Sequence, residues 1–299
     1  MYSGLSNLLS EDSIKENELM KNHTTFKIGG PVDVLVLPRT FEDIKITMEY
    51  CQRNKHPLFI FGLGSNIVVR DKGIRGVALK IGNNLKEIQI SGQEIYAQAG
   101  VRLSELARTA ANNSLSGLEF AEGIPGSLGG AVVMNAGAYG GEMKDVVLEA
   151  EAISPSGEKQ IFPAADLGFD YRKSVFQYND YVVVAVKMKL KPGVQSEIKS
   201  KMREYAHSRR EKQPLEYPSA GSVFRRPPGY YVGPMIEKMG LKGYCVGGAQ
   251  VSEKHAGFIV NTGNAKASDV LELIEIIKKA AREQFGVDLQ PEIRVVGEQ

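Results

Sequence analysis

The sequence contains little cysteine and little histidine, with two cysteines and four histidines in 299 residues. Cys51 and Cys245 lie far apart and form no CxxC pair, which argues against a disulfide and against a zinc ion bound by cysteines. The histidines show none of the short spacings that are typical of metal ligands. We therefore expect neither a structural disulfide nor a bound metal ion.

The sequence also lacks an excess of charge of either sign and any long hydrophobic run. Thirty-seven basic residues against 35 acidic residues leave a net charge of +2, whereas nucleic-acid-binding domains are usually strongly basic on one face. No apolar stretch approaches the roughly 20 residues that span a bilayer, and no basic segment followed by an apolar run indicates a signal peptide. We expect a cytoplasmic monomer with no nucleic-acid or membrane partner.

Glycine is abundant and clustered. Hydrophobic residues make up 42% of the chain and charged residues 24%, which is ordinary for a globular enzyme. The 32 glycines, however, gather in a few segments. Clustered glycine marks places where the backbone takes positive φ or approaches a ligand closely.

Strand-like and helical patterns alternate along the chain, which predicts an α+β fold. The first twenty residues are polar and irregular and indicate a frayed arm or a short helix. Helical spacing of apolar residues predicts helices at residues 41–54, 102–113, 195–211 and 267–285, and another near Met235. Short apolar runs predict strands at residues 32–37, 58–61, 67–69, 77–79, 146–153, 160–162, 181–190 and 293–296. A hairpin is predicted within residues 88–97, around Ser91 and Gly92.

A first glycine loop, residues 62–66 (GLGSN), follows a predicted strand. Successive backbone N–H groups in such a loop can converge on an anion. A Rossmann fingerprint requires a third glycine and then a helix, but Ile67 stands at that position and a β-branched run follows. A phosphate cradle and a plain hairpin turn fit the residues about equally well.

A second glycine loop, residues 123–138 (GIPGSLGGAVVMNAGA), combines small residues with almost no charge. Such a stretch can lie flat against a planar or phosphorylated ligand, because it offers N–H donors without bulk. The alternative is a tightly packed turn and helix. Two such loops on either side of a small α+β unit suggest a large, two-ended cofactor.

These loops, together with residues 23–30 (HTTFKIGG), resemble in order and spacing the three flavin-binding signatures of the FAD-dependent UDP-N-acetylenolpyruvoylglucosamine reductases, the MurB family. The resemblance implies non-covalent FAD and NADPH as co-substrate. It also implies a two-part FAD-binding domain of the vanillyl-alcohol-oxidase (PCMH) type at residues 1–210, split near residue 80. A smaller α+β substrate domain at residues 211–286 and a C-terminal segment at 287–299 would follow.

The resemblance assigns the cofactor to the two glycine loops. The diphosphate would lie on Gly62, Gly64, Ser65 and Asn66. The flavin side would be lined by Gly123, Ile124, Ser127, Gly129 and Ala131.

Three further segments resemble the catalytic motifs of the same family: residues 171–176 (YRKSVF), 219–224 (SAGSVF) and 291–294 (PEIR). They imply Arg172, Ser222 and Glu292 as catalytic residues. The implied reaction reduces UDP-N-acetylglucosamine enolpyruvate to UDP-N-acetylmuramate in peptidoglycan precursor synthesis.

The residue types suit that chemistry. Hydride from reduced flavin to the methylene carbon leaves negative charge that spreads into the substrate carboxylate, and Arg172 can neutralise it in a prearranged way. Ser222 would then protonate the carbanion carbon. Glu292 suits the site if it is protonated and donates a hydrogen bond.

Each assignment has a plainer alternative. Arg172 would pair on the surface with Asp170 or Asp180, Ser222 would be a turn hydroxyl, and Glu292 would be solvated. The resemblance favours the catalytic roles.

Basic residues near the end of the helix predicted at 195–211 are candidates for binding the substrate diphosphate. Lys212 aligns approximately with a substrate-binding lysine of the family, and we expect Tyr171, Arg209 and Arg225 to contact the substrate as well. The alternative is a solvated basic helix end that complements the helix dipole. The short segment between Arg172 and Lys212 resembles the compact branch of the family, which lacks an inserted tyrosine loop.

Two rival functions remain open at this stage. One is another flavin oxidase or dehydrogenase of the same fold, many of which bind flavin covalently. The other is a nucleotide-sugar-binding regulator without catalytic activity.

Overall fold

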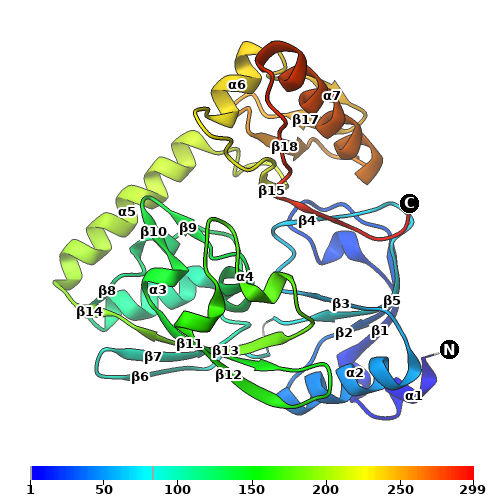
Figure 1. The fold of residues 1–299 in the computed structure, drawn as a ribbon, viewed down its shortest axis with the longest axis vertical. Coiled ribbons are helices and arrows are strands. Elements are labelled where there is room, and N and C mark those ends of the chain that lie inside the picture. The colour runs from blue at the N-terminus through cyan, green and yellow to red at the C-terminus, as the bar shows by residue number, and fades with distance from the viewer. Residues whose placement is uncertain (1, 83) are drawn as a thin grey trace. The chain divides into compact units, whose positions relative to one another are not determined.

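The computed structural model describes residues 2–82 and 84–299, and the chain forms two compact units (Figure 1). Unit 1 comprises Met1–Glu16, Val34–Leu63 and Gly76–Arg209. Unit 2 comprises Asn17–Asp33, Gly64–Arg75 and Arg210–Gln299. Each unit has its own hydrophobic core. The division into an FAD-binding domain, a substrate domain and a C-terminal segment stays a prediction.

The larger sheet of unit 1 is antiparallel, with the strand order β12-β11-β13-β7-β6 (Figure 1). Its strands are β6 (Ile88–Ser91), β7 (Glu94–Gln98), β11 (Val147–Ile153), β12 (Lys159–Pro163) and β13 (Val182–Lys189). The central strand β13 is buried along most of its length, which agrees with its apolar run at residues 182–186. Helix α4 (Leu128–Val133) packs on β13 and β7, and α3 (Leu103–Asn112) contributes buried residues to the same core.

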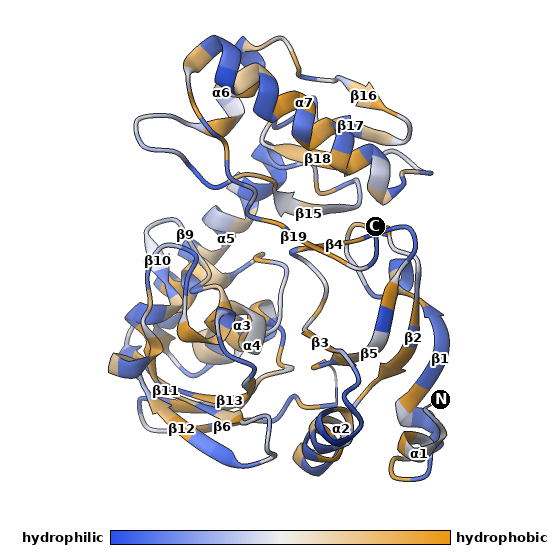
Figure 2. Cartoon of the chain, turned by 45° about the vertical axis from the view of Figure 1, so that its right-hand side comes forward, coloured by the Kyte–Doolittle hydropathy of each residue, from blue (hydrophilic) through white to orange (hydrophobic). Residues whose placement is uncertain are grey.

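A second sheet has the strand order β1-β2-β5-β3. Its strands are β1 (Ile14–Leu19), β2 (Pro31–Val36), β3 (Leu58–Phe61) and β5 (Ile74–Lys80). Helix α2 (Phe41–Asn54) follows β2 and begins with a capping box, in which Thr40 and Asp43 satisfy each other's backbone N–H groups. Its polar residues face outward (Figure 2), while Ile44, Met48 and Cys51 are buried.

Unit 2 contains an antiparallel sheet covered by a long amphipathic helix. The strand order is β15-β18-β17-β16, formed by β15 (Ser219–Ser222), β18 (Phe258–Asn261), β17 (Ala249–Val251) and β16 (Cys245–Val246). Helices α6 (Val232–Lys238) and α7 (Ala267–Phe285) contact each other, and α7 also contacts β16 and β17. An apolar stripe along α7 (Figure 2) is buried at Val270, Leu273, Ile274, Ile277 and Ala281.

Residues 64–75 are held to the rest of unit 2 by backbone pairing and by a helix cap. Strand β4 (Ile67–Val69) pairs in parallel with β19 (Arg294–Val296), with Ile67 opposite Arg294. Just after β4, the carboxylate of Asp71 accepts the N–H groups of Ala267 at 2.8 Å and Ser268 at 3.0 Å. The negative charge of the Asp71 carboxylate, placed against these N–H groups, stabilises the start of α7.

The remaining elements are short apart from α5 (Gln195–Lys212). They are α1 (Ser3–Ser6), β8 (Leu115–Ser116), β9 (Gly137–Ala138), β10 (Gly141–Glu142) and β14 (Lys191–Pro192). None of the helices in the described part of the chain combines the length and hydrophobicity that a membrane span requires.

Most predicted elements are confirmed, including α2 and α7 with the predicted bounds and the β6–β7 hairpin. The prediction for the first twenty residues was incomplete, because residues 14–19 form strand β1 rather than part of an arm. Strand β1 lies at the edge of its sheet, and none of its residues is fully buried. It therefore carries no apolar alternation by which a half-buried strand is recognised.

We predict that Asp71→Ala destabilises the protein by about 1–2 kcal/mol, because α7 loses the carboxylate that caps its first N–H groups. Urea unfolding of the variant and the wild type measures this loss. The control is Asp12→Ala, which removes an exposed ion pair with Arg39 and is expected to cost less than about 1 kcal/mol. Equal losses in the two variants would contradict the capping role.

Candidate active site

The second glycine loop enters α4 through closely packed backbone. Gly123 has φ +76°, and a Cβ built there would lie 2.9 Å from the Arg209 side chain. A Cβ on Gly129 would lie 2.8 Å from that of Ala99, and the Gly129 N–H donates to the Ala99 carbonyl at 2.9 Å. Small residues are therefore needed here for packing within unit 1, as in the plainer interpretation of this loop.

The backbone N–H groups of several predicted flavin-lining residues are already hydrogen-bonded to carbonyl groups of unit 1. Ile124 donates to the Ala121 carbonyl at 3.1 Å, and Ala131 donates to the Ser127 carbonyl at 2.9 Å. With Gly129 bonded to Ala99, these three residues can line a ligand but cannot offer it a backbone N–H group.

Ser127 differs from its neighbours, since its side chain is only 1% exposed and its Oγ has no hydrogen-bond partner in the part of the chain that the structure describes. Gly62, in the first glycine loop, faces it so closely that a Cβ on Gly62 would overlap the Ser127 Oγ. A buried hydroxyl without a partner costs about 1–3 kcal/mol. Such a group calls for an explanation, and a missing ligand atom is one.

In unit 2, the continuation of the first glycine loop presents unused donors. Among the described residues, the backbone N–H groups of Gly64, Ser65 and Asn66 donate no hydrogen bond. Gly64 has φ +67°, and its carbonyl accepts the N–H of Thr25 at 3.1 Å. Consecutive free N–H groups around a left-handed residue form a concavity that suits an anion.

The same loop is joined to the segment that carries Glu292. The Asn66 side-chain amide donates to the Glu292 carbonyl at 3.3 Å, and the Asn66 carbonyl accepts the Arg294 N–H at 3.0 Å. The Glu292 N–H donates to the Val223 carbonyl at 2.7 Å, next to a β-bridge between Phe224 and Pro291. Backbone pairing thus brings together the segments of Asn66, Ser222 and Glu292.

Ser222 ends strand β15 with its side chain partly exposed. Its Oγ donates to the Phe224 carbonyl at 3.5 Å, the upper limit for a hydrogen bond. The preceding Gly221 has φ +82° with open space around it. The hydroxyl therefore has a weak local partner and is able to turn toward a ligand.

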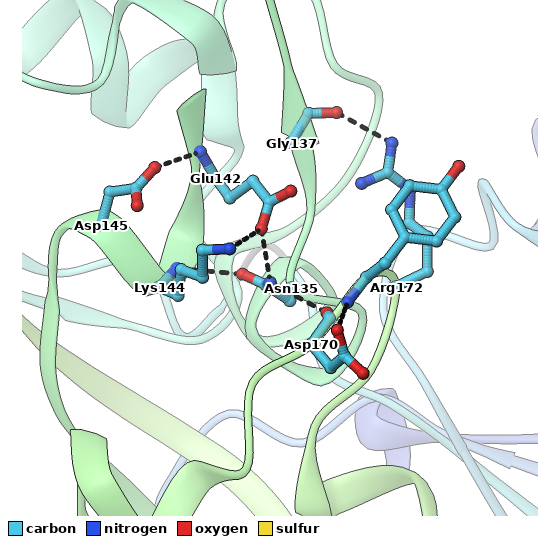
Figure 3. A network of polar contacts seen from close by, with 8 residues as sticks. Asn135, Gly137, Glu142, Lys144, Asp145, Asp170 and Arg172 are labelled. Atoms are coloured by element: carbon cyan, nitrogen blue, oxygen red, sulfur yellow. Dashed lines mark hydrogen bonds and ion pairs between the residues drawn. The ribbon is translucent and has the colours of Figure 1, made fainter. Parts of the chain in front are cut away.

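Arg172 lies in unit 1 at the tip of a tight turn closed by Asp170 and Lys173, each of which donates its N–H to the other's carbonyl. Arg172 has φ +54°, and its Nη2 donates to the Gly137 carbonyl at 3.0 Å (Figure 3). The guanidinium also lies over the ring of the exposed Tyr171, 5.0 Å from its centroid. The turn thus places a fixed positive charge beside the second glycine loop.

Comparison with known proteins gives the family. Residues 32–161 match an FAD-binding domain family, and residues 213–296 match the family described as the C-terminal domain of UDP-N-acetylenolpyruvoylglucosamine reductase. The UDP-N-acetylenolpyruvoylglucosamine reductase of Syntrophomonas wolfei is 60% identical over 299 residues, which is 100% of both chains. The chain belongs to this reductase family. The reductase of Caldanaerobacter subterraneus is 51% identical, over 98% of this chain and 97% of its own.

Solved structures agree with membership of the reductase family. The Thermus caldophilus reductase is similar with a TM-score of 0.81 and 36% identity, covering 93% of this chain and 97% of that one. The glucose dehydrogenase Phl p 4.0202 is similar with a TM-score of 0.52 and 13% identity over 65% of this chain and 44% of its own, which shows the fold alone. The predicted α+β class with a two-part FAD-binding domain is confirmed.

The predicted substrate cations of this reductase-family chain occupy different surroundings. Lys212 is exposed at the last residue of α5. Arg209 is 8% exposed, lies against Gly123, and has its guanidinium 5.5 Å from the centroid of the Tyr139 ring. Burial lowers the pKa of Arg209, and the charges of Tyr139 and Glu122 oppose that shift. The Nε of Arg225 is buried and has no acceptor among the described residues.

Two residues in these segments were not singled out from the sequence. Thr25 lies inside the first flavin-type motif, and its Oγ1 donates to the Ser219 carbonyl at 2.7 Å. Asn135, at the end of the second glycine loop, is fully buried with φ +40°. An asparagine within a glycine cluster is a signal for a left-handed residue, but its bond to the Asp170 carbonyl, 35 residues away, has no such signal.

We predict that Gly62→Ala lowers the free energy of unfolding by about 1–3 kcal/mol, because the new methyl group overlaps the Ser127 Oγ. Adding Ser127→Ala removes the overlapping atom and should restore stability. Ser127→Ala alone should cost nothing, since its hydroxyl has no protein partner to lose. Urea unfolding without added ligand measures all three, and a double variant no more stable than Gly62→Ala would contradict this geometry.

Proposed function

We propose that this protein reduces UDP-N-acetylglucosamine enolpyruvate to UDP-N-acetylmuramate, with NADPH as the electron donor and FAD as the cofactor, in the synthesis of peptidoglycan precursors. One observation carries the proposal, namely the 60% identity over the full length of both chains to a UDP-N-acetylenolpyruvoylglucosamine reductase. The glycine loops and polar groups described above supply what such a reaction needs.

The residues present fit FAD. The Ser127 hydroxyl is a buried donor that awaits an acceptor, and the N–H groups of Gly64, Ser65 and Asn66 suit a diphosphate. Gly62, Gly123, Ile124, Gly129 and Ala131 would line the cofactor through their small or apolar surfaces. When bound, the flavin takes hydride from NADPH and supplies it to the substrate.

Arg172 is proposed to bind the substrate carboxylate and to neutralise the charge that develops there. A guanidinium stays charged at any physiological pH and offers two parallel N–H donors to a carboxylate. Its bond to the Gly137 carbonyl and the closed turn hold it in place before substrate arrives. Charge that is already oriented stabilises a transition state without the cost of reorganisation.

Ser222 is proposed to donate a proton to the carbon that carries the substrate carboxylate. Its hydroxyl makes only a long bond to the Phe224 carbonyl, so little is lost when it turns to the substrate. Glu292 is proposed to act as a protonated carboxyl that donates a hydrogen bond to the same negative charge. The Glu292 N–H donates to the carbonyl of Val223, the residue after Ser222, at 2.7 Å.

The diphosphate of the substrate is proposed to bind Lys212 and Arg225. Lys212 is exposed, and the buried Nε of Arg225 is a donor that awaits an acceptor. Tyr171, exposed beside Arg172, is proposed to contact the substrate as well. The burial of Arg209 against Gly123 favours support of the glycine loop over direct contact with the substrate. We further propose that the protein works in the cytoplasm as a monomer.

We predict that Ser222→Ala leaves reduction of the flavin by NADPH within about twofold of wild type and slows reoxidation by the enolpyruvyl sugar by about 10²–10⁴-fold, the usual contribution of a proton donor. Stopped-flow absorbance under anaerobic conditions measures the two half-reactions separately. Ser219→Ala, in the same strand, is the control and should change neither.

Equal slowing of both half-reactions in Ser222→Ala would point to a disturbed site and would overturn its role as proton donor. Wild-type enzyme whose reduced flavin is not reoxidised by the enolpyruvyl sugar would overturn the proposed function itself.

A further inference from the structure

Two amide side chains connect the turn of Arg172 to the end of helix α4 in unit 1. Asn135 contacts the turn before Arg172, at the Asp170 carbonyl. Gln177 contacts it at the carbonyl of Arg172 itself. Asn135 belongs to the segment that follows α4, and Gln177 also binds the carbonyl of Val133, the last residue of α4, so the two amides join this end of the second glycine loop to the turn.

Asn135, itself fully buried, is the centre of a network of polar contacts (Figure 3). Its Nδ2 donates to the Asp170 carbonyl at 3.0 Å and to the Glu142 carboxylate at 2.9 Å, while its Oδ1 accepts the Lys144 N–H at 2.9 Å. Lys144 in turn pairs with Glu142 at 3.0 Å, and this contact raises the pKa of Lys144. Both N–H donors of the amide and its oxygen are therefore used, at a residue that is 0% exposed.

Gln177 makes a second bridge. Its Nε2 donates to the Arg172 carbonyl at 2.9 Å and to the Val133 carbonyl, at the last residue of α4, also at 2.9 Å. The Val133 carbonyl also accepts the hydroxyl of the buried Ser174 at 2.8 Å. The end of α4 thus accepts two side chains from the segment that follows Arg172.

The turn needs such support because Arg172 has φ +54°. A residue with a Cβ pays roughly 1–2 kcal/mol to adopt the left-handed conformation, and a strained residue keeps it only where the surroundings enforce it. Without the two amides, the Asp170 and Arg172 carbonyls lose their side-chain donors. The turn would then relax toward ordinary φ values, and the guanidinium would move with it.

We propose that Asn135 and Gln177 are positioning residues, which hold the strained turn so that the Arg172 guanidinium stays where the substrate carboxylate binds. This rests on the proposed catalytic role of Arg172. The same amides connect the turn to residues 133–135 of the second glycine loop, so Arg172 stays in a fixed position relative to that part of the loop. A misplacement of about 1 Å in a reacting constellation can cost about 10²-fold in rate.

The test uses Gln177→Met, which keeps the length of the side chain but removes both donors, and Asn135→Asp, which keeps the oxygen and tolerates the left-handed backbone. Each should slow reoxidation of the reduced, FAD-loaded enzyme by the enolpyruvyl sugar by about 10–10²-fold. Reduction by NADPH should stay within about twofold of wild type. Matched controls are Gln195→Met and Asn113→Asp, whose amides donate to backbone carbonyls elsewhere in unit 1, and neither should change reoxidation.

A readout independent of turnover is hydrogen exchange of the FAD-loaded protein, followed by mass spectrometry on the peptide that covers residues 168–178. Exchange should be at least about tenfold faster in Gln177→Met and Asn135→Asp than in wild type, because opening of the turn is no longer opposed by the amides. It should not change in the two controls. Exchange that matches wild type in both variants would overturn the proposal.

A double-mutant cycle separates positioning from general damage. In an Arg172→Ala background, Gln177→Met should slow reoxidation by less than about twofold, because the group it positions is gone. A further loss as large as in the wild-type background would overturn the positioning role. If Arg172→Ala itself leaves reoxidation unchanged, the catalytic role of Arg172 fails and the proposal fails with it. If reoxidation is slow in Arg172→Ala but normal in Gln177→Met and Asn135→Asp, the positioning role of the two amides is overturned and the catalytic role of Arg172 stands.

Discussion

A strained, charged turn in unit 1 depends on two amide side chains, those of Asn135 and Gln177, which connect it to the end of the short helix α4. Arg172 adopts a left-handed conformation, and the carbonyls of Asp170 and of Arg172 itself accept hydrogen bonds from Asn135 and Gln177. Asn135 follows α4 closely, and Gln177 bonds the carbonyl of Val133, the last residue of α4. Within α4, Gly129 packs directly on Ala99, the residue after β7. The buried sheet, the glycine loop and the arginine therefore form one chain of close contacts, in which small residues and buried amides have distinct tasks.

Unit 2 follows the same logic with backbone in place of side chains. The pairing of β4 with β19 and the bridge between Phe224 and Pro291 hold the segments of Asn66, Ser222 and Glu292 together. Asp71 links the end of β4 to the first turn of α7. Both units therefore present side chains from backbone segments that hydrogen bonds hold in place, which is the condition for prearranged electrostatics.

The sequence predicts the long elements well and the polar contacts poorly. Helices α2 and α7 follow from their apolar spacing and end where predicted, whereas β1 carries no pattern because it is an exposed edge strand. The roles of Arg172, Ser222 and Glu292 are predicted from resemblance to family motifs. An arginine after a tyrosine, or a serine after a glycine, does not indicate a catalytic residue by itself. Asn135 and Gln177 escaped notice because their partners are fixed only by tertiary packing.

The glycine loops show where sequence reasoning was too coarse. Small residues were expected to offer N–H donors to a ligand, yet those of Ile124, Gly129 and Ala131 bond within unit 1. The unused groups are instead the Ser127 hydroxyl and the N–H groups of residues 64–66. Composition identifies a loop that can approach a ligand, but only the three-dimensional structure separates the atoms that pack from those that remain available.

The proposed function is tested most directly by one anaerobic cycle of the wild-type protein. The bound flavin is reduced with one equivalent of NADPH, one equivalent of UDP-N-acetylglucosamine enolpyruvate is added, and absorbance and products are followed together. The absorbance of oxidised flavin should return without oxygen, with one UDP-N-acetylmuramate formed per flavin. A flavin that stays reduced until oxygen is admitted, with no UDP-N-acetylmuramate formed, would contradict the assignment.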